Sequence, residues 1–165
     1  MPLEREPIKR PMPKKQRPTE ESLPRRAADL LAARPHFSEE LRTKLIKKGY
    51  EEQKVDELIK DFKGRGYLDD GDRALLYLEE LKRKRFGKNE AVRRLVGKGV
   101  AKSDAESMAG SFFLENDEIA NIRYLLEKKK FNLKDIKEVK KAYDFLVRRG
   151  FGWDRIREVI RVEDQ

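Results

Sequence analysis

From residue 27 onward, apolar side chains recur at intervals of three and four residues, and most positions between them are charged. This spacing lines one side of an α-helix, and no stretch shows the sustained alternation of β-branched residues that is typical of a strand. Gly, Asn and Asp interrupt the pattern at short intervals. The sequence predicts an all-α fold, with helices over residues 27–34, 38–48, 52–63, 70–85, 88–98, 103–113, 116–129, 133–149 and 153–162.

A short motif at the end of a predicted helix occurs three times, with its glycines 50 and 51 residues apart. The copies run from Leu45 to Tyr50, from Leu95 to Val100 and from Leu146 to Phe151. Within them, Gly49, Gly99 and Gly150 stand where a helix would end with a residue in the left-handed conformation. Glycine adopts that conformation without steric cost, so each copy predicts the same kind of helix end.

The repeat divides the helical part of the chain into three units of three helices, over residues 27–69, 70–114 and 115–165. Each unit is too small to enclose a sizeable core by itself, so neighbouring units must pack on one another. We therefore expect an elongated, curved array with an extended concave surface. The middle helix of the third unit is predicted to be the longest of the three middle helices.

Several side chains are predicted to begin helices. Ser38 is a plausible N-cap, and Ser103 with Glu106 has the spacing of a capping box. Asp69 or Asp70 is expected to cap the first helix of the second unit. The tyrosine and leucine immediately before these aspartates are expected to pack between the first two units.

Positive charge is concentrated in the second unit. The chain has 40 Lys+Arg and 31 Asp+Glu, for a formal charge of +9, yet Glu90 is the only acidic residue within residues 82–102. A solvated helix face usually mixes both signs, because opposite charges four residues apart support the helix. A solvated face remains the alternative, but we interpret this segment as a surface for a polyanionic or acidic partner. This basic strip consists of Lys82, Arg83, Lys84, Arg85, Lys88, Arg93, Arg94, Lys98 and Lys102.

Within the basic strip, a helical wheel predicts that Arg93, Arg94 and Lys98 face away from the core. Lys128–Lys130, Arg148 and Arg149 are weaker candidates for contact with such a partner, because acidic residues are interspersed around them. Residues 1–26 hold six of the seven prolines, with eight Lys/Arg and four Glu. They predict a disordered basic tail, which either helps to hold an anionic partner or is an ordinary extension.

The residues that most enzymes need are scarce. Cysteine is absent, and His36 is the only histidine, in a predicted loop without a second metal ligand, so we expect it at the surface or partly packed. The run Asp69–Asp72 lacks the Gly and Glu spacing of an EF-hand, and no Gly-rich phosphate loop is present. Trp153 is expected to anchor the last helix, with base stacking as the alternative. We therefore expect neither enzyme activity, nor a cofactor, nor a metal site.

Targeting signals are also missing from the sequence. The first residues contain no apolar segment of a secretory signal, and no apolar run approaches the length that spans a bilayer. These features predict a cytoplasmic protein without a membrane partner, and we expect it to be a monomer.

The chain resembles the RecX family of RecA regulators over residues 27–161. The most specific element of the resemblance is the run Gly66, Tyr67, Leu68, Asp69 and Asp70, between the first and second units. Upstream, the residues from Ser38 to Tyr50 also resemble the family, and so does the C-terminal pattern Arg148 to Phe151. Residues 77–87 depart from it, being richer in Lys and Glu than the family's aromatic and Arg-rich stretch.

The resemblance implies tandem three-helix repeats that bind RecA and lie in the groove of its filament on single-stranded DNA. It also implies inhibition of recombinase and ATPase activity or of filament extension, and thus a role in recombination, DNA repair and the SOS response. The resemblance also leaves room for the opposite effect, because some family members stimulate RecA rather than inhibit it. Two alternatives remain open: a helical module that binds single- or double-stranded DNA without RecA, and a purely structural adaptor.

Overall fold

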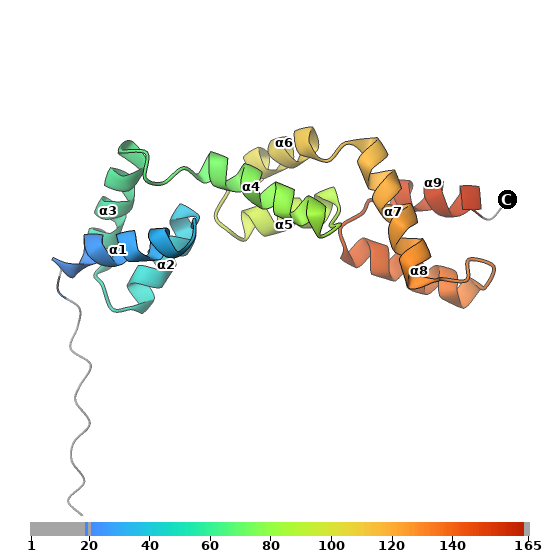
Figure 1. The fold of residues 1–165 in the computed structure, drawn as a ribbon, viewed down its shortest axis with the longest axis horizontal. Coiled ribbons are helices and arrows are strands. Elements are labelled where there is room, and N and C mark those ends of the chain that lie inside the picture. Colours follow the sequence, from blue (N-terminus) through green and yellow to red (C-terminus); the bar gives the residue numbers. More distant parts are fainter. Residues whose placement is uncertain (1–18, 20, 164–165) are drawn as a thin grey trace, which may run out of the picture.

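The computed structural model describes residue 19 and residues 21–163, and in this part of the chain it contains nine α-helices and no β-strand. The helices are α1 (Ser22–Ala33), α2 (Ser38–Lys47), α3 (Glu52–Gly64), α4 (Asp70–Arg83), α5 (Lys88–Val96), α6 (Lys102–Phe112), α7 (Glu115–Lys129), α8 (Ile136–Arg148) and α9 (Trp153–Glu163). Figure 1 shows them as three groups in a row, with α1–α3 at one end and α7–α9 at the other. The predicted all-α, elongated and curved repeat array is confirmed. None of these helices combines the length and the apolar character needed to cross a lipid bilayer.

Each group of three helices has its own cluster of buried apolar side chains. The leucine of each repeated motif, Leu45, Leu95 or Leu146, is fully buried in the cluster of its own unit. Phe37 is different: it lies in the first unit, between α1 and α2, but belongs to the cluster of the second unit. Its ring meets Tyr77 edge to face, with the centroids 5.9 Å apart. The second core is therefore completed by a residue of the first unit.

The three repeated glycines end α2, α5 and α8 in the same way. Gly49, Gly99 and Gly150 have φ angles of 98°, 92° and 90°. After each glycine, the next backbone N–H donates to the carbonyl of the motif leucine, at N–O distances of 3.4, 3.1 and 3.2 Å respectively. This is the hydrogen-bond pattern of a Schellman motif, which satisfies carbonyls that the helix itself leaves free. The predicted left-handed glycine ends are confirmed.

The start of α2 differs from the prediction. Phe37 occupies the N-cap position, and Ser38 is the first residue of the helix. The Ser38 N–H donates to Asp70 Oδ1 at 2.7 Å, so a carboxylate of the second unit supplies the acceptor that a local hydroxyl was predicted to supply. The cap of α4 is as expected: Asp69 Oδ1 accepts two backbone N–H groups of the first turn, at 2.8 and 3.0 Å.

Two other boundaries of the predicted helices also shift. The capping box predicted for Ser103 and Glu106 is wrong, because α6 begins at Lys102 and the serine hydroxyl donates to a neighbouring aspartate. The helix α8 is longer than α2 and α5, as expected, but it begins at Ile136, three residues later than predicted. The side chain of Asp135 accepts a first-turn N–H at 2.9 Å and sets this boundary.

The segment between the first two units packs on the first unit alone. Leu68 is buried in the first cluster, and the exposed ring of Tyr67 meets Phe62 of α3 edge to face, at a centroid distance of 5.5 Å. The prediction that these two residues pack between units is therefore wrong. The reason is local: Gly66, at φ 73°, turns the chain after α3, and the next two N–H groups bond back to the Phe62 carbonyl.

The predicted tail and first helix also need a correction. Most of residues 1–26 lie outside the described residues, but α1 already begins at Ser22 rather than at residue 27. Leu23 is buried in the first cluster, so the apolar side of α1 extends into the segment that was predicted to be a tail. Pro24 is compatible with this start, because the first-turn N–H groups of a helix have no intrahelical acceptor.

Candidate polyanion-binding surface

The basic strip lies in the middle unit of the array. Lys82 and Arg83 end α4, Lys84 and Arg85 follow it, Lys88, Arg93 and Arg94 belong to α5, Lys98 follows α5, and Lys102 begins α6. These cations do not form one continuous outward surface. Some hold the middle unit to its neighbours, and others point to solvent.

Three residues of the basic strip contact α7 of the third unit. The ammonium of Lys82 pairs with Asp117 at 2.6 Å. Arg85, which has a positive φ of 56°, donates to the Asn121 side chain, and its guanidinium lies 3.7 Å from the centroid of the Tyr124 ring. The backbone N–H of Lys88 donates to Glu118 Oε1 at 2.9 Å, although burial raises the pKa of that carboxyl. These contacts fix the orientation of the third unit.

Backbone hydrogen bonds complete the same junction. The Gly87 N–H donates to the Arg149 carbonyl at 2.8 Å, and the Asn89 N–H donates to the Gly150 carbonyl at 3.0 Å. Carbonyls at the end of α8 thus satisfy N–H groups at the start of α5, where each helix lacks partners of its own. A Cβ added at Gly87 would lie 2.5 Å from the Gly150 oxygen, so a side chain there would separate the two backbones.

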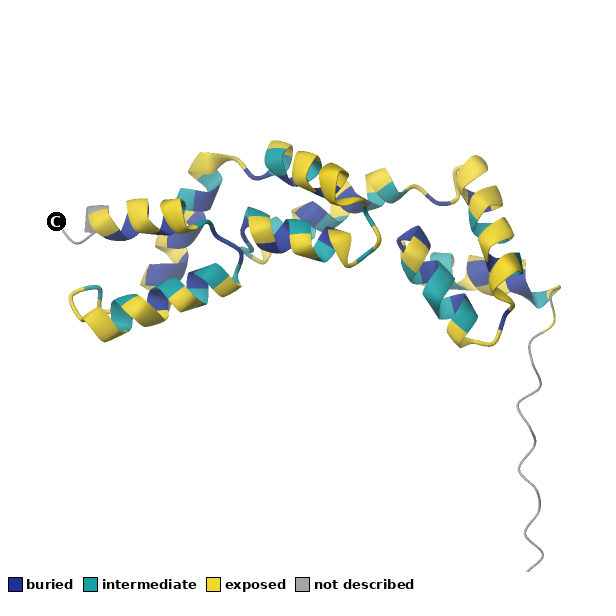
Figure 2. Ribbon diagram, turned by 180° about the vertical axis from the view of Figure 1, so that it is seen from behind, coloured by how far each residue is buried: buried dark blue, intermediate teal, exposed yellow. Residues whose placement is uncertain are grey.

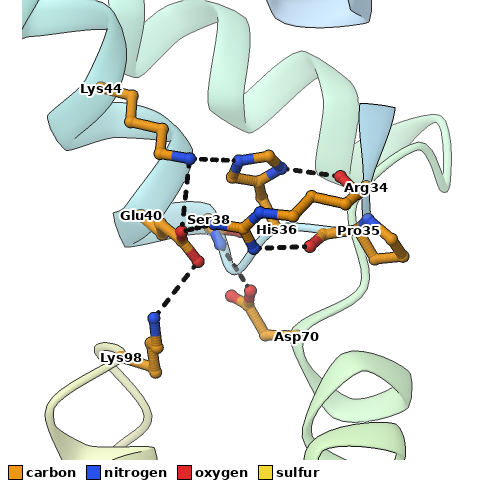
Figure 3. Close-up of polar contacts among 8 residues, drawn as sticks. All are labelled: Arg34, Pro35, His36, Ser38, Glu40, Lys44, Asp70 and Lys98. Atoms are coloured by element: carbon orange, nitrogen blue, oxygen red, sulfur yellow. Dashed lines mark hydrogen bonds and ion pairs between the residues drawn. The ribbon is translucent and has the colours of Figure 1, made fainter. Parts of the chain in front are cut away.

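The junction between the first two units is built in a related way. A Cβ added at Gly99, after α5, would lie 2.7 Å from the Glu39 Cβ in α2, so the glycine end of one middle helix again meets the first turn of the preceding one. Beside it, Lys98 pairs with Glu40 at 3.5 Å. Figure 3 shows Lys98 reaching this carboxylate and Asp70 lying beneath Ser38.

Glu40 is the centre of the polar network in Figure 3, with Arg34, Lys44 and Lys98 around it. Partial burial opposes ionisation of Glu40, but the hydrogen bond from Arg34 and the charge of Lys98 outweigh it and lower its pKa to about 2. Next to it, His36 is 4% exposed, contrary to the expected surface or partly packed position. Its Nδ1 lies 2.7 Å from the Arg34 carbonyl and its Nε2 2.7 Å from Lys44 Nζ. Burial lowers the pKa of His36.

The cations of α5 share one carboxylate. Glu90 is buried and accepts hydrogen bonds from Arg93 at 2.8 Å and from Arg94 at 2.6 Å, and these bonds lower its pKa. Arg94 also lies over the Phe86 ring, 4.3 Å from its centroid, whereas the Arg93 side chain is 75% exposed. Lys98 is not on the wheel of α5, because that helix ends before it. Of the three residues predicted to face outward, Arg93 does so most clearly.

The outward members of the basic strip are therefore few. Arg83 is exposed and makes no ion pair with any residue of the described part. Lys84 and Lys102 are exposed but paired with glutamates one helical turn away, at 2.6 and 3.8 Å. The sequence interpretation counted carboxylates along the chain, where Glu90 stands alone. Folding brings Glu40, Asp117 and Glu118 to the strip from other units.

A second set of cations was underrated by the sequence interpretation. Six exposed lysines near the α7–α8 turn and along α8 make no ion pair within residues 19 and 21–163. They are Lys128, Lys129, Lys130, Lys134, Lys137 and Lys140. The acidic residues interspersed among them have other roles: Asp135 caps α8, and Glu138 pairs with Lys141 at 2.7 Å. Counting lysines along the sequence, without subtracting the carboxylates that cap a helix or pair with another lysine, would have identified this set.

Comparison with known proteins agrees with the repeat architecture. The family model described as "RecX, first three-helix domain" matches residues 25–62, and "RecX, third three-helix domain" matches residues 116–160. These matches coincide with the first and last groups of helices in Figure 1.

Similar proteins carry the same family name. The regulatory protein RecX of Pelodictyon phaeoclathratiforme is 32% identical over 140 residues, which cover 82% of this chain and 85% of the relative. That of Vibrio vulnificus is 33% identical over 141 residues, covering 83% and 90%. The crystal structure of RecX from Lactobacillus salivarius has the same fold, with a TM-score of 0.76 at 18% identity, covering 88% of this chain and 96% of that chain. The chain belongs to the RecX family of regulatory proteins.

Proposed function

We propose that this protein regulates the RecA recombinase by binding along its filament on single-stranded DNA, in the groove, and restraining recombinase and ATPase activity or filament extension. In this proposal it acts in the cytoplasm as a monomer, by binding alone, without a cofactor or a reaction of its own. It thereby modulates recombination, DNA repair and the SOS response. Membership of a family of regulatory proteins supports the choice of target.

The observation that carries the proposal is the elongated array, in which specific contacts join the first unit to the second and the second unit to the third. Backbone hydrogen bonds join α5 to α8, and glycine ends without side chains lie against the preceding middle helix in both junctions. A repeat array of this kind presents an extended curved surface rather than a closed pocket, and such a surface suits a long, grooved partner. Arg83 and Arg93 add exposed positive charge in the middle unit.

The test is the ATPase activity of RecA on single-stranded DNA during titration with this protein. We expect ATP hydrolysis to fall as the protein is added, and the effect to weaken at higher salt, because contacts between exposed charges are screened. A heat-unfolded sample serves as the control for nonspecific inhibition. An unchanged ATPase rate and unchanged strand exchange, together with tight binding to naked DNA, would favour the module that acts without RecA. The structural adaptor would show neither DNA binding nor an effect on RecA.

A further inference from the structure

The third unit combines an exposed aromatic residue with unpaired cations. Trp153, the only tryptophan of the chain, begins α9 and is 57% exposed. Its ring stacks on Tyr143 of α8, with the ring centroids 5.1 Å apart and an angle of 26° between the ring planes. It therefore has the stacking contact expected of an anchoring residue, yet more than half of it remains open to solvent.

The side of α8 next to this aromatic pair carries apolar and basic residues together. Lys140 precedes Tyr143 by three residues and Ile136 precedes Lys140 by four, so they follow one side of the helix. Ile136 is 86% exposed, and Lys137 beside it is exposed as well. Figure 2 shows exposed residues recurring along both α8 and α9 in this unit. We call Ile136, Lys137, Lys140, Tyr143 and Trp153 the α8–Trp153 face.

We propose that the α8–Trp153 face is a binding site for single-stranded nucleic acid, in which Trp153 stacks on a base and Lys137 and Lys140 contact the backbone phosphates. An aromatic ring offers every base a stacking partner, and lysines beside it neutralise the phosphates of the same strand. A duplex would use only the lysines, since its bases are stacked on one another. The preference for nucleic acid over an acidic protein rests on the proposed function, but binding at this face needs no RecA.

Exposed carboxylates beside this face work against the site, since Asp135 adjoins Ile136 and Asp154, next to Trp153, has a side chain that is 97% exposed. Asp144 lies four residues after Lys140 on the same side of α8, and within the described residues it forms no ion pair. A negative charge there repels phosphate. Replacing Asp144 by its neutral isostere asparagine should therefore increase the affinity for single-stranded nucleic acid.

The sole tryptophan makes the site directly observable. We would titrate the full-length protein with oligo(dT) and follow Trp153 fluorescence, without RecA. Quenching is expected from stacking, and inorganic polyphosphate, which has charge but no bases, should leave the emission nearly unchanged. Absence of quenching by oligo(dT), equal quenching by polyphosphate, or tighter binding of poly-glutamate than of oligo(dT) would each overturn the proposal.

Variants would then be compared by anisotropy of a labelled oligo(dT), with circular dichroism as the check on folding. Trp153→Ala should lower affinity about 5- to 150-fold, the range of a lost base stack, while Trp153→Phe keeps most of the affinity. The pair Lys137→Gln and Lys140→Gln should reduce the slope of log affinity against log salt by about 1.4, because each phosphate contact contributes about 0.7. Asp144→Asn should bind more tightly than the wild type.

The charge-matched control is Lys47→Gln with Lys48→Gln, at the exposed end of α2 in the first unit. Equal losses in this control and in the α8 pair would reject a local site in favour of a general charge effect. Failure of the proposed function is recognised separately: the wild type would then bind oligo(dT) at this face and still leave RecA ATPase activity unchanged.

Discussion

Gly150 of the third unit lies so close to Glu90 of the second that a Cβ added at Gly150 would overlap the Glu90 backbone nitrogen. The same glycine has a φ of 90° and its carbonyl accepts a hydrogen bond from Asn89. One residue thus ends α8, turns the chain into α9 and docks the third unit on α5. Substitutions at glycines can separate these roles.

Replacing Gly150 by Ala should destabilise the protein more than the same change at other glycines. The left-handed conformation alone costs about 1–3 kcal/mol for a residue with a side chain. Gly66→Ala isolates that cost, because Gly66 also has a positive φ but nothing lies within 4 Å of its added Cβ. Gly152→Ala is the control without either penalty, since its added Cβ also meets nothing within 4 Å. In urea unfolding, the free energy of unfolding should be lowest for Gly150→Ala, higher for Gly66→Ala and highest for Gly152→Ala. Equal losses at Gly150 and Gly66 would contradict the close docking.

Asp70→Ala should weaken the junction between the first two units. It removes the acceptor of the Ser38 N–H and the ion pair with Lys63 at 2.9 Å. Loss of a helix cap costs about 0.5–2 kcal/mol, and we expect a loss of that size in the free energy of unfolding. Asp72→Ala, in the same helical turn, is the comparison, because Asp72 makes no ion pair with the residues that the structure describes. A larger loss for Asp72→Ala would refute the role of Asp70 as a cap across units.

Stability should fall in two steps as the pH is lowered. His36 has a lowered pKa in the folded protein, so below about pH 6.5 the unfolded chain takes up the proton first and stability begins to decrease. Glu40 has a pKa of about 2 instead of 4.5, so its contribution is present above pH 4.5 and is lost between pH 4.5 and about 2. Thermal melts between pH 2 and 8 would cover both steps. His36→Gln should remove the first step and keep the second; a first step that survives this change must come from another group.

Under the proposed function, removing the outward cations of the middle unit should weaken RecA inhibition by more than its effect on stability explains, although Arg93 also donates hydrogen bonds to the buried Glu90. Arg83→Gln with Arg93→Gln neutralises the two exposed arginines, whereas Lys47→Gln with Lys48→Gln removes the same charge from the first unit. Inhibition of RecA ATPase activity should decrease only for the arginine pair, and its salt dependence should become shallower. Full inhibition by the arginine variant would rule out their contact with the filament.

A cation that serves a junction should behave differently. Lys82→Gln breaks the ion pair with Asp117. Both side chains of this pair are partly exposed to solvent, so we expect the free energy of unfolding to fall by no more than about 1 kcal/mol. Any loss of RecA inhibition by this variant should follow its loss of stability in urea unfolding. Weaker inhibition at unchanged stability would instead place Lys82 on the binding surface.

Local features of the sequence predicted most of the architecture. The threefold recurrence of a leucine, a glycine and an apolar residue predicted the ends of α2, α5 and α8, because a left-handed C′ residue is a local property of the chain. Helical periodicity placed the other helices to within a few residues, except that α1 begins five residues before the predicted start at residue 27. The candidate site was harder, because the partner of a cation is chosen by distance in space. Arg94 and Lys98 were expected outside, but Glu90, Phe86 and Glu40 hold them.

By itself the sequence determined the all-α class, the three-unit repeat and the glycine ends, since hydrophobic period and backbone conformation act over a few residues. Only the tertiary structure decided which cations of the basic strip are held at the junctions and which carboxylate caps α2. Those outcomes depend on contacts between residues some thirty to sixty positions apart, such as Ser38 with Asp70 and Lys98 with Glu40. They exist only once the units are docked, because docking removes water from the groups at each junction and makes each of them bond to a partner from the neighbouring unit.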